Sequence, residues 1–281
     1  MNEKIALLVD SMCDLPREII DRFGIYVIAP RIIYPYGEFR DRLEITPEEV
    51  YGRMPDEIPT TSLPSIEDIM EAFDRIKLDG FTHVLAVHIS NALSSTVEVV
   101  AMQAKEIKEL TINVVDSKTL TMGTGWMVYD AAKNIAAGWS FDKVVQRINQ
   151  VKSQVKVYYI LETLEYLRRG GRIGKVAGML AEFMHFKPVI SVDLEGKYFT
   201  FAKTRGRIKS IEKLVEIVQK AAQAGPVNLA IMHGGAQDEF DKLVKRLTAL
   251  PNIKEVVTSD ISPALGVNTG PGLLGVAIQE L

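Results

Sequence analysis

The segment Thr60–Ser65 carries four side-chain hydroxyls within six residues, directly before a predicted helix. Hydroxyls and backbone N–H groups at the start of a helix can donate hydrogen bonds to a small anion, and the positive end of the helix dipole favours negative charge there. The segment contains no carboxylate, histidine or cysteine. These residue types predict a place that holds an anion and carries out no acid–base chemistry.

A second hydroxyl-rich loop, Ser90–Thr96, follows the predicted strand Val84–Ile89. Ligands of parallel α/β sheets gather at the carboxyl ends of the strands, so two such loops could face one spot. An anion pocket would then contain Thr61, Ser62 and Ser94. The alternative is that these side chains only cap helices, which is the usual role of Ser and Thr at a helix start.

The segment Arg168–Lys175 places four cations around three glycines. As a functional site, it would let Arg172 grip a carboxylate or phosphate with two parallel hydrogen bonds. As a structural feature, it would be a helix C-terminus, where glycine adopts left-handed geometry and cations suit the dipole. The residues favour neither interpretation over the other.

Other residues that could do chemistry are weaker candidates. Asp10–Asp14 follows a predicted strand but lacks the glycines of a nucleotide-binding loop, so we expect Asp14 to cap the next helix and Asp10 to pin the loop. The histidines have no metal-ligand spacing, and no metal site is expected; they are His83, His88, His185 and His233.

Strands and helices alternate in the first half of the chain, which predicts βαβ units and a parallel sheet. The expected strands are Ile5–Val9, Ile25–Ile33, Val84–Ile89 and Ile112–Val115. Thr46 and Glu49 form a capping box for a helix over Pro47–Met54. In the second half, Asp193–Lys197 is typical of a turn between two antiparallel strands. A boundary near Ser153 predicts domains at 1–153 and 154–281.

Composition excludes several classes of function. The 281 residues carry a net charge of −3, which argues against nucleic-acid binding. Cys13 is the single cysteine, so a reducing cytoplasm is expected. Ile5–Val9 is too short for a secretory signal. The uncharged run Ile261–Gln279 contains two prolines and four glycines, so we do not expect an integral membrane segment.

Several short motifs together resemble the DegV family of bacterial fatty-acid-binding proteins. In chain order they are Val9–Pro16, Thr61–Ser65, Ile89–Ser94, Val115–Ser117, Tyr166–Ile173 and Gly270–Gly272. The resemblance covers nearly the whole chain, and the order and spacing of the motifs make it specific. It implies an α/β fold with an N-terminal three-layer α/β/α domain around a parallel sheet and a C-terminal two-layer domain with a mixed sheet.

The resemblance also implies a ligand and a partner. It implies one bound long-chain fatty acid, with the carboxylate at the domain junction and the tail in an apolar tunnel, and no other cofactor. It further implies the role of a non-catalytic binding subunit that presents the acid to a separate ATP-dependent fatty acid kinase. The alternative is a small-molecule phosphotransferase, or another enzyme, that uses the same interdomain cleft.

Individual residues follow from the same resemblance. Thr61 and Ser94 match the headgroup hydroxyls of the family, with Ser62 adjacent, and Arg172 stays a candidate carboxylate ligand from the chemistry of its own segment. Asn268 stands where the family usually has a histidine, two residues before Gly270. Asparagine can donate a hydrogen bond but cannot become cationic. The candidate tail lining consists of Ile173, Val176, Met179, Leu180, Phe183, Met184 and Phe186.

Overall fold

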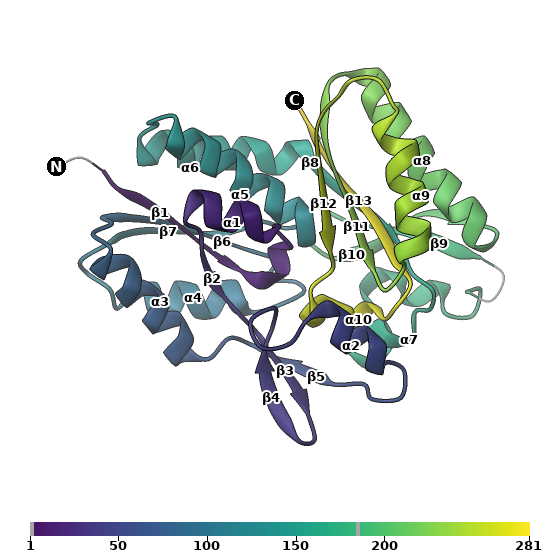
Figure 1. Ribbon diagram of the computed structural model, residues 1–281, viewed down its shortest axis with the longest axis horizontal. Coiled ribbons are helices and arrows are strands. Elements are labelled where there is room, and N and C mark those ends of the chain that lie inside the picture. Colours follow the sequence, from purple (N-terminus) through teal and green to yellow (C-terminus); the bar gives the residue numbers. More distant parts are fainter. Residues whose placement is uncertain (1–2, 184–185) are drawn as a thin grey trace.

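The computed structural model describes residues 3–183 and 186–281, which form two main sheets, a small third sheet, and helices packed on them (Figure 1). The first sheet is entirely parallel, in the order β2-β1-β6-β7. Its strands are β1 (Ile5–Asp10), β2 (Tyr26–Ile28), β6 (His83–His88) and β7 (Thr111–Asp116). The parallel sheet predicted for the first half is therefore confirmed.

Helices cover both faces of this sheet. α3 (Ile66–Leu78) and α4 (Thr96–Ala104) pack on one face, where Phe73 and Val100 are fully buried. The opposite face carries α1 (Arg17–Phe23), α5 (Thr121–Ala136) and α6 (Phe141–Gln154).

The second sheet is mixed and has the order β10-β9-β8-β13-β11-β12. Only β11 and β12 pair in parallel. The strands are β8 (Val155–Ile160), β9 (Lys187–Val192), β10 (Tyr198–Thr204), β11 (Val227–Gly234), β12 (Ile253–Asp260) and β13 (Leu273–Glu280). The predicted hairpin at Asp193–Lys197 joins β9 to β10 and is confirmed. α8 (Gly206–Ala224) and α9 (Gln237–Thr248) cover one face.

α5 lies between the two sheets and joins them into one core. Its Trp126 is fully buried and donates a hydrogen bond of 3.0 Å from Nε1 to the carbonyl oxygen of Ala277 in β13. A single cluster of buried apolar side chains runs from β1 through α5 to β8 and β11. The expected division at 153/154 coincides with the end of α6, although this core crosses it, and the two-domain boundaries stay a prediction.

A small antiparallel sheet projects beside the parallel one, with the order β4-β3-β5. Its strands are β3 (Arg31–Tyr34), β4 (Gly37–Arg40) and β5 (Thr60–Ser62), with α2 (Pro47–Arg53) between β4 and β5. Two expectations change here. The single strand expected over Ile25–Ile33 is broken at Ala29-Pro30 into β2 and β3, which belong to different sheets. Thr60–Ser62 is itself a strand, and Ser65 alone caps α3.

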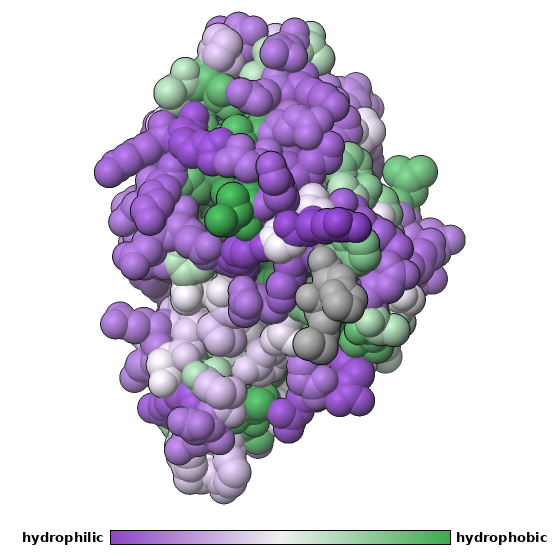
Figure 2. Space-filling model, turned by 90° about the vertical axis from the view of Figure 1, so that its right-hand side faces the viewer, coloured by the Kyte–Doolittle hydropathy of each residue, from purple (hydrophilic) through white to green (hydrophobic). Residues whose placement is uncertain are grey.

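Four short helical elements complete the fold and lie where the sheets meet. They are η1 (Ser11–Cys13), α7 (Glu165–Arg169), η2 (Gly174–Met179) and α10 (Pro263–Thr269). Figure 2 shows the face on the side of α8 and α9, where apolar side chains lie scattered among hydrophilic ones. Scattered exposed apolar residues are ordinary for a globular surface.

Candidate functional site

A cavity of about 270 Å³ opens where β5, the loop after β6, the segment after α7, and α10 meet. Its lining consists of Met12, Pro30, Thr61, Ser62, Leu63, Ile89, Leu93, Ser94, Arg172, Tyr198, Ala264, Leu265 and Asn268. The five residues expected to bind a carboxylate are all among them. The structure thus brings together side chains from both halves of the chain.

Thr61 and Ser62 reach the cavity from an edge strand. β5 pairs with β3 so that Ile32 lies opposite Thr61 and Arg31 opposite Ser62. The two hydroxyls therefore stand on a braced strand that ends three residues before Ser65, the N-cap residue of α3. Their orientation depends on strand pairing, which neighbouring residues in the sequence could not indicate.

Ser94 reaches the same cavity from the loop after β6. Its backbone N–H donates to the carbonyl oxygen of Ser90 over 3.1 Å, and its Oγ lies 2.9 Å from Thr96 Oγ1. Ser94 precedes α4 by two residues, and the N-cap position belongs to Ser95, which makes no side-chain capping bond. The Oγ of Ser94 also accepts a long hydrogen bond of 3.4 Å from the backbone N–H of Thr96, the first residue of α4, so the capping interpretation of this hydroxyl holds in part.

Among the residues that the structure describes, Arg172 is the one charged side chain that lines the cavity. Its Nη1 donates to the carbonyl oxygen of Gly170 over 2.6 Å, and its Nε donates to that of Leu93 over 3.4 Å. The guanidinium thus ties the turn after α7 to the loop that carries Ser94. The structural interpretation of this arginine–glycine segment is confirmed, since α7 ends at Arg169, whereas the grip of Arg172 on an anion stays a prediction.

Asn268 enters the cavity from α10. Its Nδ2 donates to the carbonyl oxygen of Ala264 over 3.1 Å. Its Oδ1 approaches Gly170 so closely that a Cβ there would lie 2.0 Å away. Gly170 therefore makes room for the side chain at position 268.

Two buried aspartates hold the start of α10 in place. Asp14 Oδ1 accepts a hydrogen bond of 2.9 Å from the backbone N–H of Ser262 and pairs with Arg42 Nη2 at 3.0 Å. Asp41 Oδ1 accepts one of 2.9 Å from the N–H of Ala264. Burial raises the pKa of both carboxyls, that of Asp41 to about 6. These contacts set the position of Leu265 and Asn268 relative to the first sheet.

This arrangement corrects one prediction and confirms another. Asp14 does not cap α1, whose N-cap residue is Pro16 and has no side-chain capping bond. Asp10 does pin its loop, because it accepts hydrogen bonds from the backbone N–H groups of Met12 and Ile89 at 3.1 and 3.0 Å. The Asp14 contact spans 248 residues, so no local pattern could reveal it.

The residues expected to line an acyl tunnel do not line this cavity. Val176, Met179 and Phe183 are buried in the main core, whereas Leu180 is 39% exposed. Ile173 and Phe186 are partly buried against the same core, and Met184 lies outside the described residues. Their role with a ligand stays a prediction.

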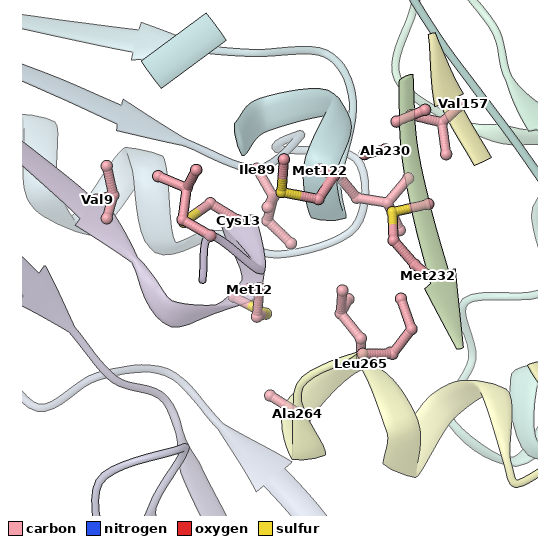
Figure 3. Close-up of a cluster of buried hydrophobic side chains, with 14 of the residues drawn as sticks. Val9, Met12, Cys13, Ile89, Met122, Val157, Ala230, Met232, Ala264 and Leu265 are labelled. Atoms are coloured by element: carbon pink, nitrogen blue, oxygen red, sulfur yellow. The ribbon is translucent and has the colours of Figure 1, made fainter. Parts of the chain in front are cut away.

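A second, very small cavity adjoins the first through Leu265, which lines both. Its lining is mostly apolar: Leu120, Thr121, Val157, Tyr159, Met232, Ile261, Leu265, Thr269 and Leu273. Figure 3 shows Leu265 extending from α10 toward Met232, with Met12 and Met122 in the same buried cluster. Methionine side chains are flexible and adapt readily to irregular spaces.

In residues 3–183 and 186–281, no group of three or more His, Cys, Asp or Glu side chains is placed to hold a metal ion. Over the same residues, no helix has the length and apolar composition needed to cross a bilayer. Fold and cavity together define an α/β protein with two main sheets and a hydroxyl-lined cavity at their junction.

Comparison with known proteins identifies the family. The DegV family model, described as "Uncharacterised protein, DegV family", matches residues 4–281. A DegV domain-containing protein of Clostridium acetobutylicum is 40% identical over 276 residues, which cover 98% of this chain and 99% of that protein. The chain belongs to the DegV family.

Solved structures agree with this assignment. A DegV family protein from Thermus thermophilus, described by its fatty acid binding, superposes with a TM-score of 0.91 at 30% identity, covering 99% of this chain and 100% of that one. A fatty acid binding DegV family protein from Streptococcus agalactiae gives 0.89 at 25% identity, covering 99% of both chains. The predicted fold class, with a parallel and a mixed sheet, is confirmed.

Proposed function

We propose that this protein binds one long-chain fatty acid, with the carboxylate among Thr61, Ser62, Ser94, Arg172 and Asn268. The observation that carries the proposal is that all five residues line one cavity. Three hydroxyls, an amide and a guanidinium can satisfy both carboxylate oxygens. The relative from Thermus thermophilus, whose fold is closely similar, is described as binding fatty acid.

The acyl tail would extend past Leu265 into the methionine-rich core. A C16 chain supplies about 0.8 kcal/mol per buried CH₂, which amounts to more than about 10 kcal/mol of gross transfer free energy. Leu265 lines both the hydroxyl-rich cavity and its apolar neighbour, and is therefore the side chain that would move to admit the tail. The described members of the other candidate lining line neither cavity, so we favour the route past Leu265; they are Ile173, Val176, Met179, Leu180, Phe183 and Phe186.

The route can be tested with Leu265→Phe. The phenylalanine ring is larger than the leucine side chain and should obstruct the route. It should lower the affinity for hexadecanoate more than the affinity for decanoate, because only the longer chain must pass residue 265. Leu180→Phe, at an exposed position of the other candidate lining, is the matched control. If Leu180→Phe lowered the affinity for hexadecanoate relative to decanoate and Leu265→Phe did not, the Ile173–Phe186 route would be supported instead.

We further propose that the protein is a non-catalytic subunit that presents the acid to a separate ATP-dependent kinase. Within residues 3–183 and 186–281, the cavity lining includes no carboxylate, histidine or cysteine that could serve as a general base. The expected cytoplasmic location rests on the single cysteine, Cys13.

Native mass spectrometry of protein purified from bacteria tests the binding proposal. We expect a co-purified mass that matches one long-chain fatty acid, with lower occupancy in Thr61→Ala and Ser94→Ala. An empty protein that hydrolyses ATP by itself would contradict the proposal and favour a phosphotransferase. Addition of a matching kinase and ATP should give acyl-phosphate; if it does not, the presenting role fails while lipid carriage stands.

A further inference from the structure

The turn between β9 and β10 rests directly on the loop that follows β6. Gly196, in this turn, has a φ of +81°. A Cβ at Gly196 would lie 1.9 Å from Ser90 Oγ and 3.3 Å from Lys118 Cα. No side chain can occupy that space, so the second half of the chain reaches Ser90 only because position 196 is glycine.

Ser90 in turn organises the loop that carries Ser94. Its carbonyl oxygen accepts hydrogen bonds from the backbone N–H groups of Leu93 and Ser94, at 2.9 and 3.1 Å. Its Oγ accepts another from the N–H of Ala92 at 3.2 Å. Ser90 is fully buried, so a displacement of Ser90 would carry the whole loop with it. Leu93 and Ser94 both line the cavity, whereas Ser90 and Gly196 do not.

The turn that holds Gly196 is itself rigidly braced. The carboxylate of Asp193 accepts hydrogen bonds from the N–H groups of Glu195 and Lys197, at 2.9 and 3.0 Å. It also pairs with Lys175 Nζ of η2 at 2.6 Å. The carbonyl oxygen of Asp193 accepts the N–H of Gly196 at 2.9 Å. A turn tied down in this way cannot easily yield to a new side chain, so the loop at Ser90 would have to move instead.

We propose that Gly196 is a positioning residue of the anion site, which sets the place of the Ser94 hydroxyl through Ser90. This inference rests on the proposed function, because it assigns to Ser94 a ligand carboxylate. Gly196 does not line the cavity. Because it has no side chain, the β9–β10 turn can pack against Ser90 and hold it where its carbonyl oxygen accepts the hydrogen bonds from Leu93 and Ser94. A hairpin far along the chain thereby determines the geometry of a hydroxyl that precedes α4.

The test compares Gly196→Ala with Gly138→Ala. Gly138 has a φ of +80°, and a Cβ there would meet nothing within 4 Å, so the control carries the same backbone strain without the collision. Affinities for hexadecanoate and hexadecanol are measured on delipidated protein by displacement of a fluorescent fatty acid. We expect Gly196→Ala to weaken hexadecanoate about tenfold, as the loss of one good hydrogen bond to a charged group would. Hexadecanol, which lacks the carboxylate, should bind unchanged, and Gly138→Ala should alter neither affinity.

Double variants show whether the effect passes along the proposed route. In a Ser94→Ala background, Gly196→Ala should cause no further loss of hexadecanoate affinity. A further loss of affinity in the double variant would overturn the proposal.

If Gly196→Ala does not fold, Ser90→Ala tests the same contact from the side of Ser90. We expect this variant to bind hexadecanoate more weakly than wild type and to bind hexadecanol equally well. A variant that binds both ligands with the affinity of wild type would overturn the proposal. The two proposals fail separately. Wild-type protein that binds neither ligand contradicts the proposed function. Wild-type protein that binds hexadecanoate, with Gly196→Ala behaving like Gly138→Ala, contradicts only the role of Gly196.

Discussion

The Asp41 carboxylate accepts a hydrogen bond of 2.9 Å from the backbone N–H of Ala264, 223 residues further along the chain. Asp41 is fully buried and also accepts a hydrogen bond from the hydroxyl of Ser11. This contact ties the first turn of α10 to the small antiparallel sheet and to η1. Because Leu265 and Asn268 follow on α10, the shape of the cavity depends on a buried acid that does not line it.

Asp41 should make stability depend on pH. Burial raises its pKa from 3.8 to about 6 in the folded protein, so the folded state holds this proton more tightly than the unfolded state. The resulting stability is fully present below about pH 4 and is lost as pH rises through about 6. A shift of this size corresponds to about 3 kcal/mol.

We therefore expect the unfolding free energy of wild type, relative to Asp41→Asn, to fall by about that amount between pH 4 and pH 7. Asparagine keeps an acceptor for Ala264 and a donor for Ser11 but does not titrate. Urea unfolding at several pH values measures the difference. A difference that stays constant over this range would show that Asp41 does not titrate as described.

Thr61→Ala should weaken fatty-acid binding by about 1–3 kcal/mol, because a buried carboxylate oxygen would lose its donor. Thr60→Ala is the matched control, since Thr60 lies on the same strand, is exposed and does not line the cavity. Calorimetric titration with hexadecanoate measures both. Equal affinities in the two variants would remove Thr61 from the headgroup site.

Asn268→His should introduce a pH dependence that wild type lacks. A histidine with a pKa near its usual value of about 6.5 becomes cationic as pH falls from 8 to 6 and would then attract the carboxylate. We expect the affinity of the variant for hexadecanoate to rise over this range relative to wild type and to Asn268→Ala. Parallel pH profiles for all three proteins would show that position 268 does not face the carboxylate.

Gly266→Ala should destabilise the protein, because a Cβ at this position of α10 would lie 2.5 Å from the Tyr51 hydroxyl. Tyr51 is buried, and overpacking of this kind costs about 1–3 kcal/mol. Gly52→Ala, in the neighbouring helix α2, meets nothing within 4 Å and should stabilise by about 0.5–1 kcal/mol through helix propensity. Thermal unfolding measures both variants. A lower melting temperature for Gly266→Ala and a higher one for Gly52→Ala would confirm the contact, whereas an unchanged melting temperature for Gly266→Ala would contradict it.

Features that depend on neighbouring residues could be predicted from the sequence. The capping box of Thr46 and Glu49 forms as expected, and α2 begins at Pro47. The hairpin around Asp193–Lys197 and the parallel order of the first sheet also follow from local turn chemistry and from the alternation of apolar segments. The cap and the turn are determined by residues within a few positions of each other, and the parallel sheet follows from the succession of strand, helix and strand along the chain.

Features that depend on distant residues could not be predicted. Asp14 was expected to cap the helix that follows it, but its partner is Ser262. The helix expected after Thr61 does begin at Ile66, but the pairing of Thr61 with β3 was not indicated by its neighbours. Strand pairing and buried hydrogen bonds depend on the packing of the whole core, so the residues adjacent in sequence do not indicate them.

Residue identity alone sets which groups are available to a ligand: hydroxyls at Thr61, Ser62 and Ser94, one guanidinium at Arg172, and an amide where a histidine is usual. That these groups share one cavity, and that Leu265 also lines the apolar cavity beside it, depends on the packing of the whole chain. The type of a residue does not depend on the fold. The meeting of these groups in one cavity, however, requires Asp14 and Asp41 to hold α10 in place and Gly196 to hold Ser90 in place. Those contacts exist only once both sheets have packed on α5.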